Sequence, residues 1–97
     1  MKLYCKREWE ADVPDEKIEK AVDAFARKYY AYCYSKINRA DVQSLAEYLV
    51  QITTGYDKYP NEFTKPLRMR IREIIAQRMK EDEKCRQLNQ FDIESRP

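Results

Sequence analysis

The side chains that carry most enzyme chemistry are absent from this chain. It contains no histidine and a single glycine, Gly55. Without histidine there is no imidazole base, no histidine-activated nucleophile and no histidine metal ligand. One glycine is too few for a glycine-rich phosphate-binding loop. The residue types therefore predict a protein that binds rather than catalyses, and neither an enzymatic activity nor a cofactor is expected.

Acidic residues come closest to a metal-ligand cluster at Glu81, Asp82 and Glu83. Successive residues of a helix point about 100° apart, so three contiguous carboxylates do not converge on one ion. We expect them to form a solvated helix end and predict no metal site.

The cysteine pattern bears on the compartment. Cys5, Cys33 and Cys85 are odd in number and widely spaced, which predicts neither a zinc site nor a disulfide framework. Free thiols in a reducing compartment are expected, although a disulfide between two of the three stays open. No apolar run approaches the length of a membrane span, and the N-terminus lacks the apolar stretch of a signal peptide. We therefore expect a cytoplasmic protein without a membrane partner.

Tyrosine and basic residues gather at one place in the chain. Tyr29, Tyr30, Tyr32 and Tyr34 lie within six residues, beside Arg27, Lys28 and Lys36. On one helix the four tyrosines cannot all face a single core. If Tyr29 and Tyr32 point inward, Tyr30 and Tyr34 form a pair four residues apart, one turn after Arg27. Three interpretations of the cluster stay open. Its side chains belong to a helix packed against two neighbours, form a protein interface rich in tyrosine and arginine, or form a stacking surface for single-stranded bases.

Basic residues also predominate over residues 65–80, although the whole chain carries a net charge of only +2. This stretch contains six basic residues and one acidic residue, Glu73. On a helical wheel Lys65, Arg68 and Arg72 lie within about 60° of one another. Arg70 flanks the apolar stripe on its other side. The pattern fits a solvated face, phosphate contacts with a nucleic acid, or docking to an acidic protein patch.

The loop 55–63 is rich in aromatic residues. Tyr56, Tyr59 and Phe63 have little local sequence to bury them. They either fold back onto the core or form a contact loop. Since X–Pro bonds isomerise, Tyr59-Pro60 is also a candidate contact for a host prolyl isomerase.

These residues need elements to position them, and hydrophobic periodicity predicts three helices over about 13–37, 39–54 and 65–87. Asp12 and Pro14 favour the start of the first helix. Asn38 and Asp41 resemble a capping box before the second, and Gly55 suits the left-handed position that ends it. We expect a single all-α domain, a small three-helix fold with an irregular N-terminal arm and a C-terminal tail. Three apolar residues are expected to dock that tail: Leu88, Phe91 and Ile93.

Two stretches give the chain a family likeness: Met1-Lys2-Leu3-Tyr4-Cys5-Lys6 and Arg27-Lys28-Tyr29-Tyr30-Ala31-Tyr32. With its length and overall character, the chain resembles the small anti-RecBCD accessory recombination proteins of lambdoid bacteriophages. The resemblance implies a protein of the host bacterial cytoplasm that binds a host exonuclease–helicase and inhibits or modulates it, favouring phage recombination. Neither stretch is a defining motif, so no functional residue is carried over.

The leading hypothesis is therefore a non-enzymatic interaction protein that binds a larger bacterial DNA-processing enzyme. The alternative is a small helical DNA- or RNA-binding module that uses the basic third helix. A self-assembling helical protein is a third class. The candidate partner-binding residues are Arg27, Tyr30, Tyr34, Tyr59, Arg68 and Arg72.

Overall fold

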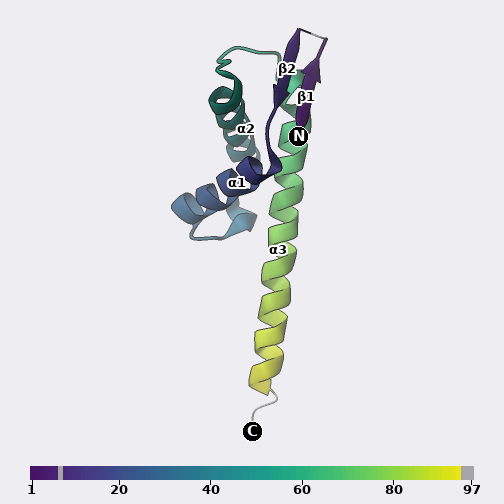
Figure 1. Ribbon diagram of the computed structural model, residues 1–97. Helices are drawn as coiled ribbons and strands as arrows, with labels where there is room; N and C mark the ends of the chain where they lie inside the picture. The colour runs from purple at the N-terminus through teal and green to yellow at the C-terminus, as the bar shows by residue number, and fades with distance from the viewer. Residues whose placement is uncertain (7, 95–97) are drawn as a thin grey trace.

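The computed structural model describes residues 1–6 and 8–94, with side chains described up to Glu81. The chain is mostly helical but not all-α, because a two-stranded antiparallel sheet precedes the helices (Figure 1). The elements in chain order are β1 (Lys2–Cys5), β2 (Trp9–Asp12), α1 (Asp15–Tyr30), η1 (Tyr34–Lys36), α2 (Arg39–Thr54), η2 (Asn61–Thr64) and α3 (Lys65–Glu94).

The predicted irregular N-terminal arm is wrong, because this segment forms a β-hairpin. β1 pairs with β2 from Lys2 opposite Asp12 to Cys5 opposite Trp9. Side chains alternate across a strand, and in β1 Leu3 and Cys5 are buried whereas Lys2 and Tyr4 are exposed. Burial of this apolar face against the helices gives the short hairpin a stability that it would lack alone.

The first helix is shorter than predicted: α1 spans 15–30 rather than 13–37. Pro14 is its N-cap residue and has no side-chain capping bond. At the other end, Ala31 and Tyr32 have left-handed backbones with φ values of 49° and 67°. The amide of Tyr32 donates to the carbonyl of Ala26, which closes the helix end. The chain then reverses into η1, and this reversal moves Tyr34 away from the helical position expected for it.

The second helix has the bounds of the prediction, 39–54. The Asn38 side chain accepts from the amide of Asp41, and the Asp41 side chain accepts from the amide of Asn38, which is a complete capping box. Gly55 follows with a φ of 81°. Both signals are local in sequence, which is why they could be identified before the fold was known.

The third helix is longer than predicted, since α3 continues to Glu94 rather than residue 87. No glycine or proline interrupts the sequence between Pro66 and Pro97, so no local signal ends the helix earlier. The 3-10 turn η2 leads directly into it. The predicted docking of a tail through Leu88, Phe91 and Ile93 falls outside the described side chains.

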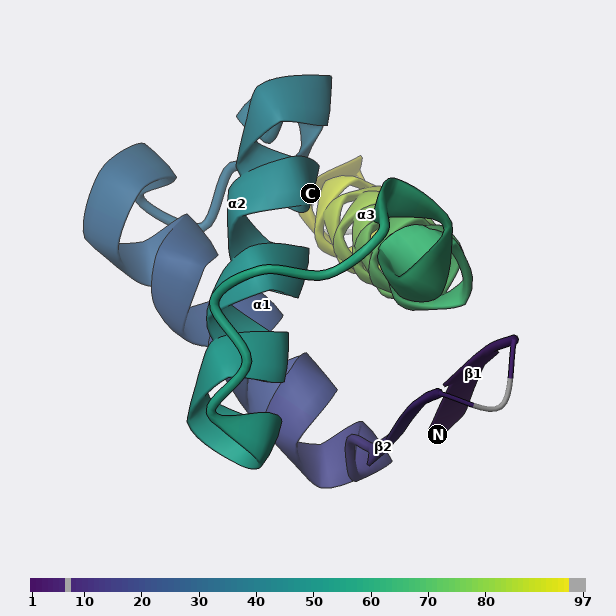
Figure 2. The ribbon, with the colours of Figure 1, turned by 90° about the horizontal axis from the view of Figure 1, so that it is seen from above.

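The core lies where the hairpin and the three helices meet. Seen from above, α1 and α2 lie to one side of α3 and the hairpin lies to another (Figure 2). The hairpin, η2 and all three α-helices contribute fully buried apolar side chains to this core, among them Leu3, Ile18, Val22, Leu49, Phe63, Leu67, Ile71 and Ile74.

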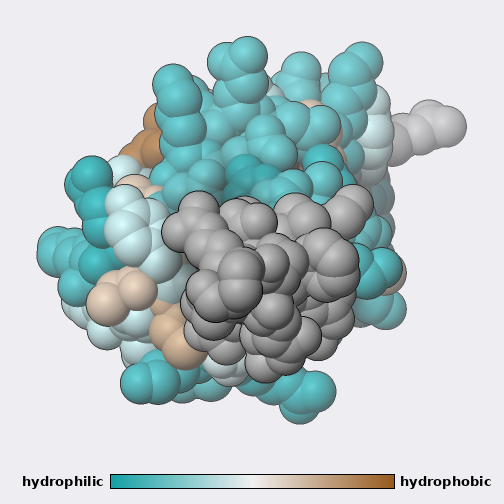
Figure 3. Space-filling model, turned by 90° about the horizontal axis from the view of Figure 1, so that it is seen from below, coloured by the Kyte–Doolittle hydropathy of each residue, from teal (hydrophilic) through white to brown (hydrophobic). Residues whose placement is uncertain are grey.

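One face of the molecule is largely polar where its described residues are visible. On the face seen from below, hydrophilic surface predominates and hydrophobic side chains reach it only in small patches (Figure 3). Across the part of the chain that the structure describes, no helix combines the length and apolarity needed to cross a membrane.

Candidate functional site

A groove of about 610 Å³ runs between α1 and α2. Residues spaced three or four apart line it from α1, among them Lys17, Ala21 and Ala24. The α2 side is lined at the same helical spacing by five residues: Ser44, Leu45, Tyr48, Leu49 and Ile52. Residues at this spacing share one face of a helix, so the groove follows from the same periodicity that builds the core.

The floor of the groove is the edge of the core itself. Leu45 and Leu49 are buried beneath it, whereas Tyr48 and Ile52 rise over it, 55% and 48% exposed. Large apolar side chains at this exposure, gathered beside one another in a concave surface, are typical of a docking site rather than of scattered surface residues.

Aromatic rings close the groove at the C-terminal end of α1. The Phe25 and Tyr29 rings lie with their centroids 4.7 Å apart, and Tyr29 is 58% exposed. The Lys28 ammonium lies 5.3 Å from the centre of the Tyr29 ring, which is cation–π geometry. Tyrosine held in this way offers a large contact area at small entropic cost on binding.

The charge of the groove is uniformly positive among the described residues. Lys17, Lys20 and Lys28 line it, and no lining residue carries a carboxylate. All three lysines are exposed, so their charges reach solvent at the rim of the groove. The groove therefore combines an apolar, aromatic interior with a basic rim.

The predicted tyrosine pair has a different place from the one expected. Tyr29 and Tyr32 are exposed, and Tyr30 and Tyr34 are half-buried against the core, which reverses the predicted arrangement. Because α1 ends at Tyr30, the pair does not lie four residues apart on one helix.

Each half-buried tyrosine is bonded to a carboxylate. The Tyr30 hydroxyl donates to Asp41 at 2.6 Å, and this hydrogen bond, with burial, raises the pKa of Tyr30. The Tyr34 hydroxyl donates to Asp23 at 2.7 Å. Burial and the bond to Asp23 together raise the pKa of Tyr34 to about 12. These contacts join α1, η1 and the start of α2, so they hold the fold together.

Three of the six basic residues between positions 65 and 80 of α3 are engaged within the protein. Arg68 donates to the Gln43 side-chain oxygen at 2.6 Å and to the Asn61 side-chain oxygen at 2.7 Å. Arg70 pairs with Asp15 and Glu73, and Arg78 pairs with Asp23. The remaining three bases of residues 65–80, Lys65, Arg72 and Lys80, are exposed, and so is Arg27 on α1.

The aromatic loop folds back onto the hairpin and core. Tyr56 packs edge-on against Trp9 with ring centroids 5.2 Å apart, and Tyr59 lies 6.0 Å from the buried Phe63 ring. Burial and the nearby charge of Glu47 raise the pKa of Tyr59. The contact with a prolyl isomerase through Tyr59-Pro60 stays a prediction.

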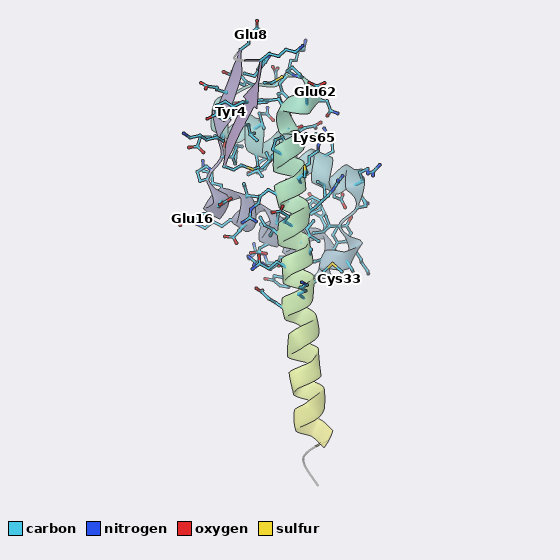
Figure 4. The ribbon with its side chains drawn as sticks, turned by 90° about the vertical axis from the view of Figure 1, so that its right-hand side faces the viewer. Tyr4, Glu8, Glu16, Cys33, Glu62 and Lys65 are labelled. Atoms are coloured by element: carbon cyan, nitrogen blue, oxygen red, sulfur yellow. The ribbon has the colours of Figure 1, made fainter. Side chains whose placement is uncertain are left out.

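Potential metal and thiol chemistry is sparse in the described part of the chain. No group of three or more cysteine, aspartate or glutamate side chains within it is placed to hold a metal ion. Cys5 is buried and Cys33 is half-buried, and both are free thiols. Figure 4 shows Cys33 well away from Glu8 at the tip of the hairpin. Cys85, Asp82 and Glu83 lie outside the described side chains.

Comparison with protein-family models, with curated proteins and with solved structures found no match.

The groove was not predicted from the sequence, although Lys28 and Tyr29 belong to the tyrosine cluster noted there. Its signal was available: Lys17, Ala21 and Ala24 flank the buried stripe of α1 at helical spacing. The sequence alone did not indicate that α2 would place Tyr48 opposite this flank.

Proposed function

We propose that this protein is a non-enzymatic interaction protein that binds an acidic, apolar-faced helix of a larger protein in the α1–α2 groove. The observation that carries the proposal is the groove, with Tyr29, Tyr48 and Ile52 exposed around an apolar floor and three lysines at its rim. An amphipathic helix docks in such a groove by inserting apolar residues, and the lysines favour a helix with acidic flanks.

The family resemblance supplies the class of target to test first, a bacterial DNA-processing enzyme of the exonuclease–helicase type, in the bacterial cytoplasm. A small protein without catalytic groups can alter such an enzyme by occupying one of its surfaces. A stable complex needs about 800 Å² of buried surface on each partner, with a few aromatic residues carrying most of the affinity. Tyr29 and Tyr48 are the candidates for that role.

The engagement of the α3 arginines favours protein docking over the nucleic-acid alternative. Arg68, Arg70 and Arg78 use their donors inside the fold, which leaves fewer charges for phosphates. The groove also differs from a base-stacking track, because much of its lining is aliphatic rather than aromatic.

The test measures DNA degradation by a purified RecBCD-type exonuclease–helicase with increasing amounts of this protein. The wild type is expected to change the rate, and the groove variant Tyr29→Ala with Tyr48→Ala is expected to weaken the apparent affinity by at least about tenfold. Tyr4→Ala with Tyr32→Ala is the matched control, because these tyrosines are similarly exposed, at 57% each, but do not line the groove.

Two results would contradict the proposal. The first combines two observations. Wild-type protein leaves the rate of DNA degradation unchanged, and a pull-down from nuclease-treated lysate recovers no partner that depends on the groove. The pull-down uses about 300 mM salt, which weakens bridges made by nucleic acid. The other is an equal loss of affinity in the groove and control variants. Recovery of nucleic acid alone, at low salt and without nuclease, would support the DNA- or RNA-binding alternative.

A further inference from the structure

The C-terminal part of α3 extends past the rest of the molecule. A helix of 30 residues is about 45 Å long. Among the described side chains, its buried residues from Leu67 to Ile75 lie in its first half, and Arg78 is its last residue in an ion pair with α1. Beyond this point the helix runs on alone in two perpendicular views (Figures 1 and 4). The molecule is accordingly elongated, 64 × 22 × 19 Å.

A helix that projects from a body depends on burial of an apolar face against another element to offset the entropy lost on ordering its backbone. The body of its own chain cannot supply this burial, because a continuous helix that leaves the body does not turn back to the α1–α2 groove. Another molecule is therefore the natural partner of this segment.

The chemistry of this segment is complementary to the groove. In sequence, residues 81–94 contain five carboxylates and two bases. Three of the carboxylates are consecutive, at 81–83, and the groove carries three lysines. The segment also has apolar residues at positions 85, 88 and 91, the three-residue spacing with which amphipathic helices occupy apolar grooves.

We infer that, in the absence of a target, two copies of this chain exchange the C-terminal segments of α3, each segment docking in the α1–α2 groove of the other copy. The inference rests on the proposed function, because it uses the same groove as a helix-docking site. Each copy contributes one groove and one segment, so a two-fold dimer satisfies both and closes the assembly. A target helix then competes with the second copy for the groove.

Two full-length charge-reversal variants test this exchange by sedimentation. The groove variant is Lys17→Glu, Lys20→Glu and Lys28→Glu, and the segment variant is Asp82→Lys and Glu83→Lys. Wild type is expected to dimerise by about 100 µM, whereas each variant alone places like charges together and is expected to be monomeric there. An equimolar mixture of the two variants restores opposite charges at both contacts and is expected to form a heterodimer.

The controls separate charge placement from net charge and from folding. Lys36→Glu, Lys58→Glu and Lys65→Glu change the same number of exposed lysines outside the groove and are expected to leave the dimer intact. Circular dichroism checks that every variant keeps its helicity. Should a reversal unfold the chain, the neutral variants K17Q/K20Q/K28Q and D82N/E83Q are expected to raise the dimer dissociation constant several-fold.

A wild type that stays monomeric at about 100 µM, or a dimer that persists in both reversal variants, overturns the inference. A mixture that fails to restore the dimer overturns it as well. These results leave the proposed function standing, because its readout is DNA degradation. If the variant with Lys17, Lys20 and Lys28 changed to Glu keeps both its self-association and its effect on the enzyme, the inference and the groove-binding proposal fail together.

Discussion

Arg78 of α3 and Asp23 of α1 form a two-point ion pair across 55 residues of sequence. The Nε and Nη2 atoms of Arg78 donate to the two carboxylate oxygens of Asp23, at 3.1 and 3.3 Å. The same carboxylate accepts from the Tyr34 hydroxyl. One side chain of α1 thereby joins the helix to η1 and to the midpoint of α3, where the long helix leaves the body.

Asp23→Asn is expected to lower the free energy of unfolding by about 1–2 kcal/mol, a range reduced because the pair is partly exposed. The amide keeps the shape of the side chain but loses the charge that holds Arg78. Urea denaturation checks the value, with the exposed Glu16→Gln as a control that should change it little. An unchanged midpoint for Asp23→Asn would remove this network from the stabilising contacts.

The same residue predicts an acid-dependent loss of stability. Burial acts to raise the pKa of Asp23, but hydrogen bonds from Arg78 and Tyr34 outweigh it, so its pKa lies below the ordinary value of 3.8. Its contribution is then fully present above pH 3.8 and is lost as the pH falls through the lowered pKa. Unfolding measured from pH 6 downward should show a shallower acid slope for Asp23→Asn than for wild type. Equal slopes would contradict the assignment.

Tyr34 predicts the corresponding behaviour at high pH. Its pKa is raised from 10.0 to about 12, first by burial and then by the bond to Asp23. The folded state thus favours the neutral hydroxyl, and the resulting stability is present below pH 10.0 and is lost as the pH rises through about 12. Tyr34→Phe has no hydroxyl to ionise and should lack this component. Ultraviolet titration of tyrosinate should show the late-titrating group in wild type and not in the variant.

The four clustered tyrosines should divide between structure and surface. Tyr34→Ala is expected to destabilise the protein by about 1–2 kcal/mol, because it creates a void and leaves Asp23 with one partner fewer. Tyr30→Ala is expected to shift the melting temperature in the same direction. Tyr29→Ala should leave it nearly unchanged, since this side chain is 58% exposed. A large loss from Tyr29→Ala would place that ring in the core and weaken the case for the groove.

Gly55→Ala tests the end of α2. A Cβ at this position meets no atom within 4 Å, but the φ of 81° is one that residues with side chains rarely adopt. The expected cost is about 1 kcal/mol, arising from backbone strain alone. Thermal or urea unfolding measures it, and a stabilised variant would contradict the left-handed assignment.

Asn38→Ala tests the other end of the same helix. The substitution removes the acceptor for the Asp41 amide and opens the capping box, at an expected cost of about 1 kcal/mol. Ser44→Ala, at an exposed position inside α2, is a suitable control and should be neutral or slightly stabilising. Similar behaviour of the two variants would indicate that the cap contributes nothing.

The sequence by itself determined those features whose signals are local. Both ends of α2 follow from residues within a few positions of each other, and the apolar periodicity identified the helices and much of the core. The absence of histidine and the single glycine limited the available chemistry in the same direct way. Each of these inferences uses residue types and short spacings, which do not change with the path of the chain.

Only the tertiary structure decided where α1 ends, that the N-terminus pairs as a hairpin, and which tyrosines face outward. The contact that turns Tyr34 inward is with Asp23, eleven residues earlier, and the partner of Asp23 is 55 residues further on. Helical spacing alone placed Tyr30 and Tyr34 outside the core only if Tyr29 and Tyr32 pointed inward, and it left that choice open. The bonds of Tyr30 and Tyr34 to the half-buried carboxylates of Asp23 and Asp41 compete with that spacing. The groove depends on how α2 packs beside α1, which no local pattern encodes.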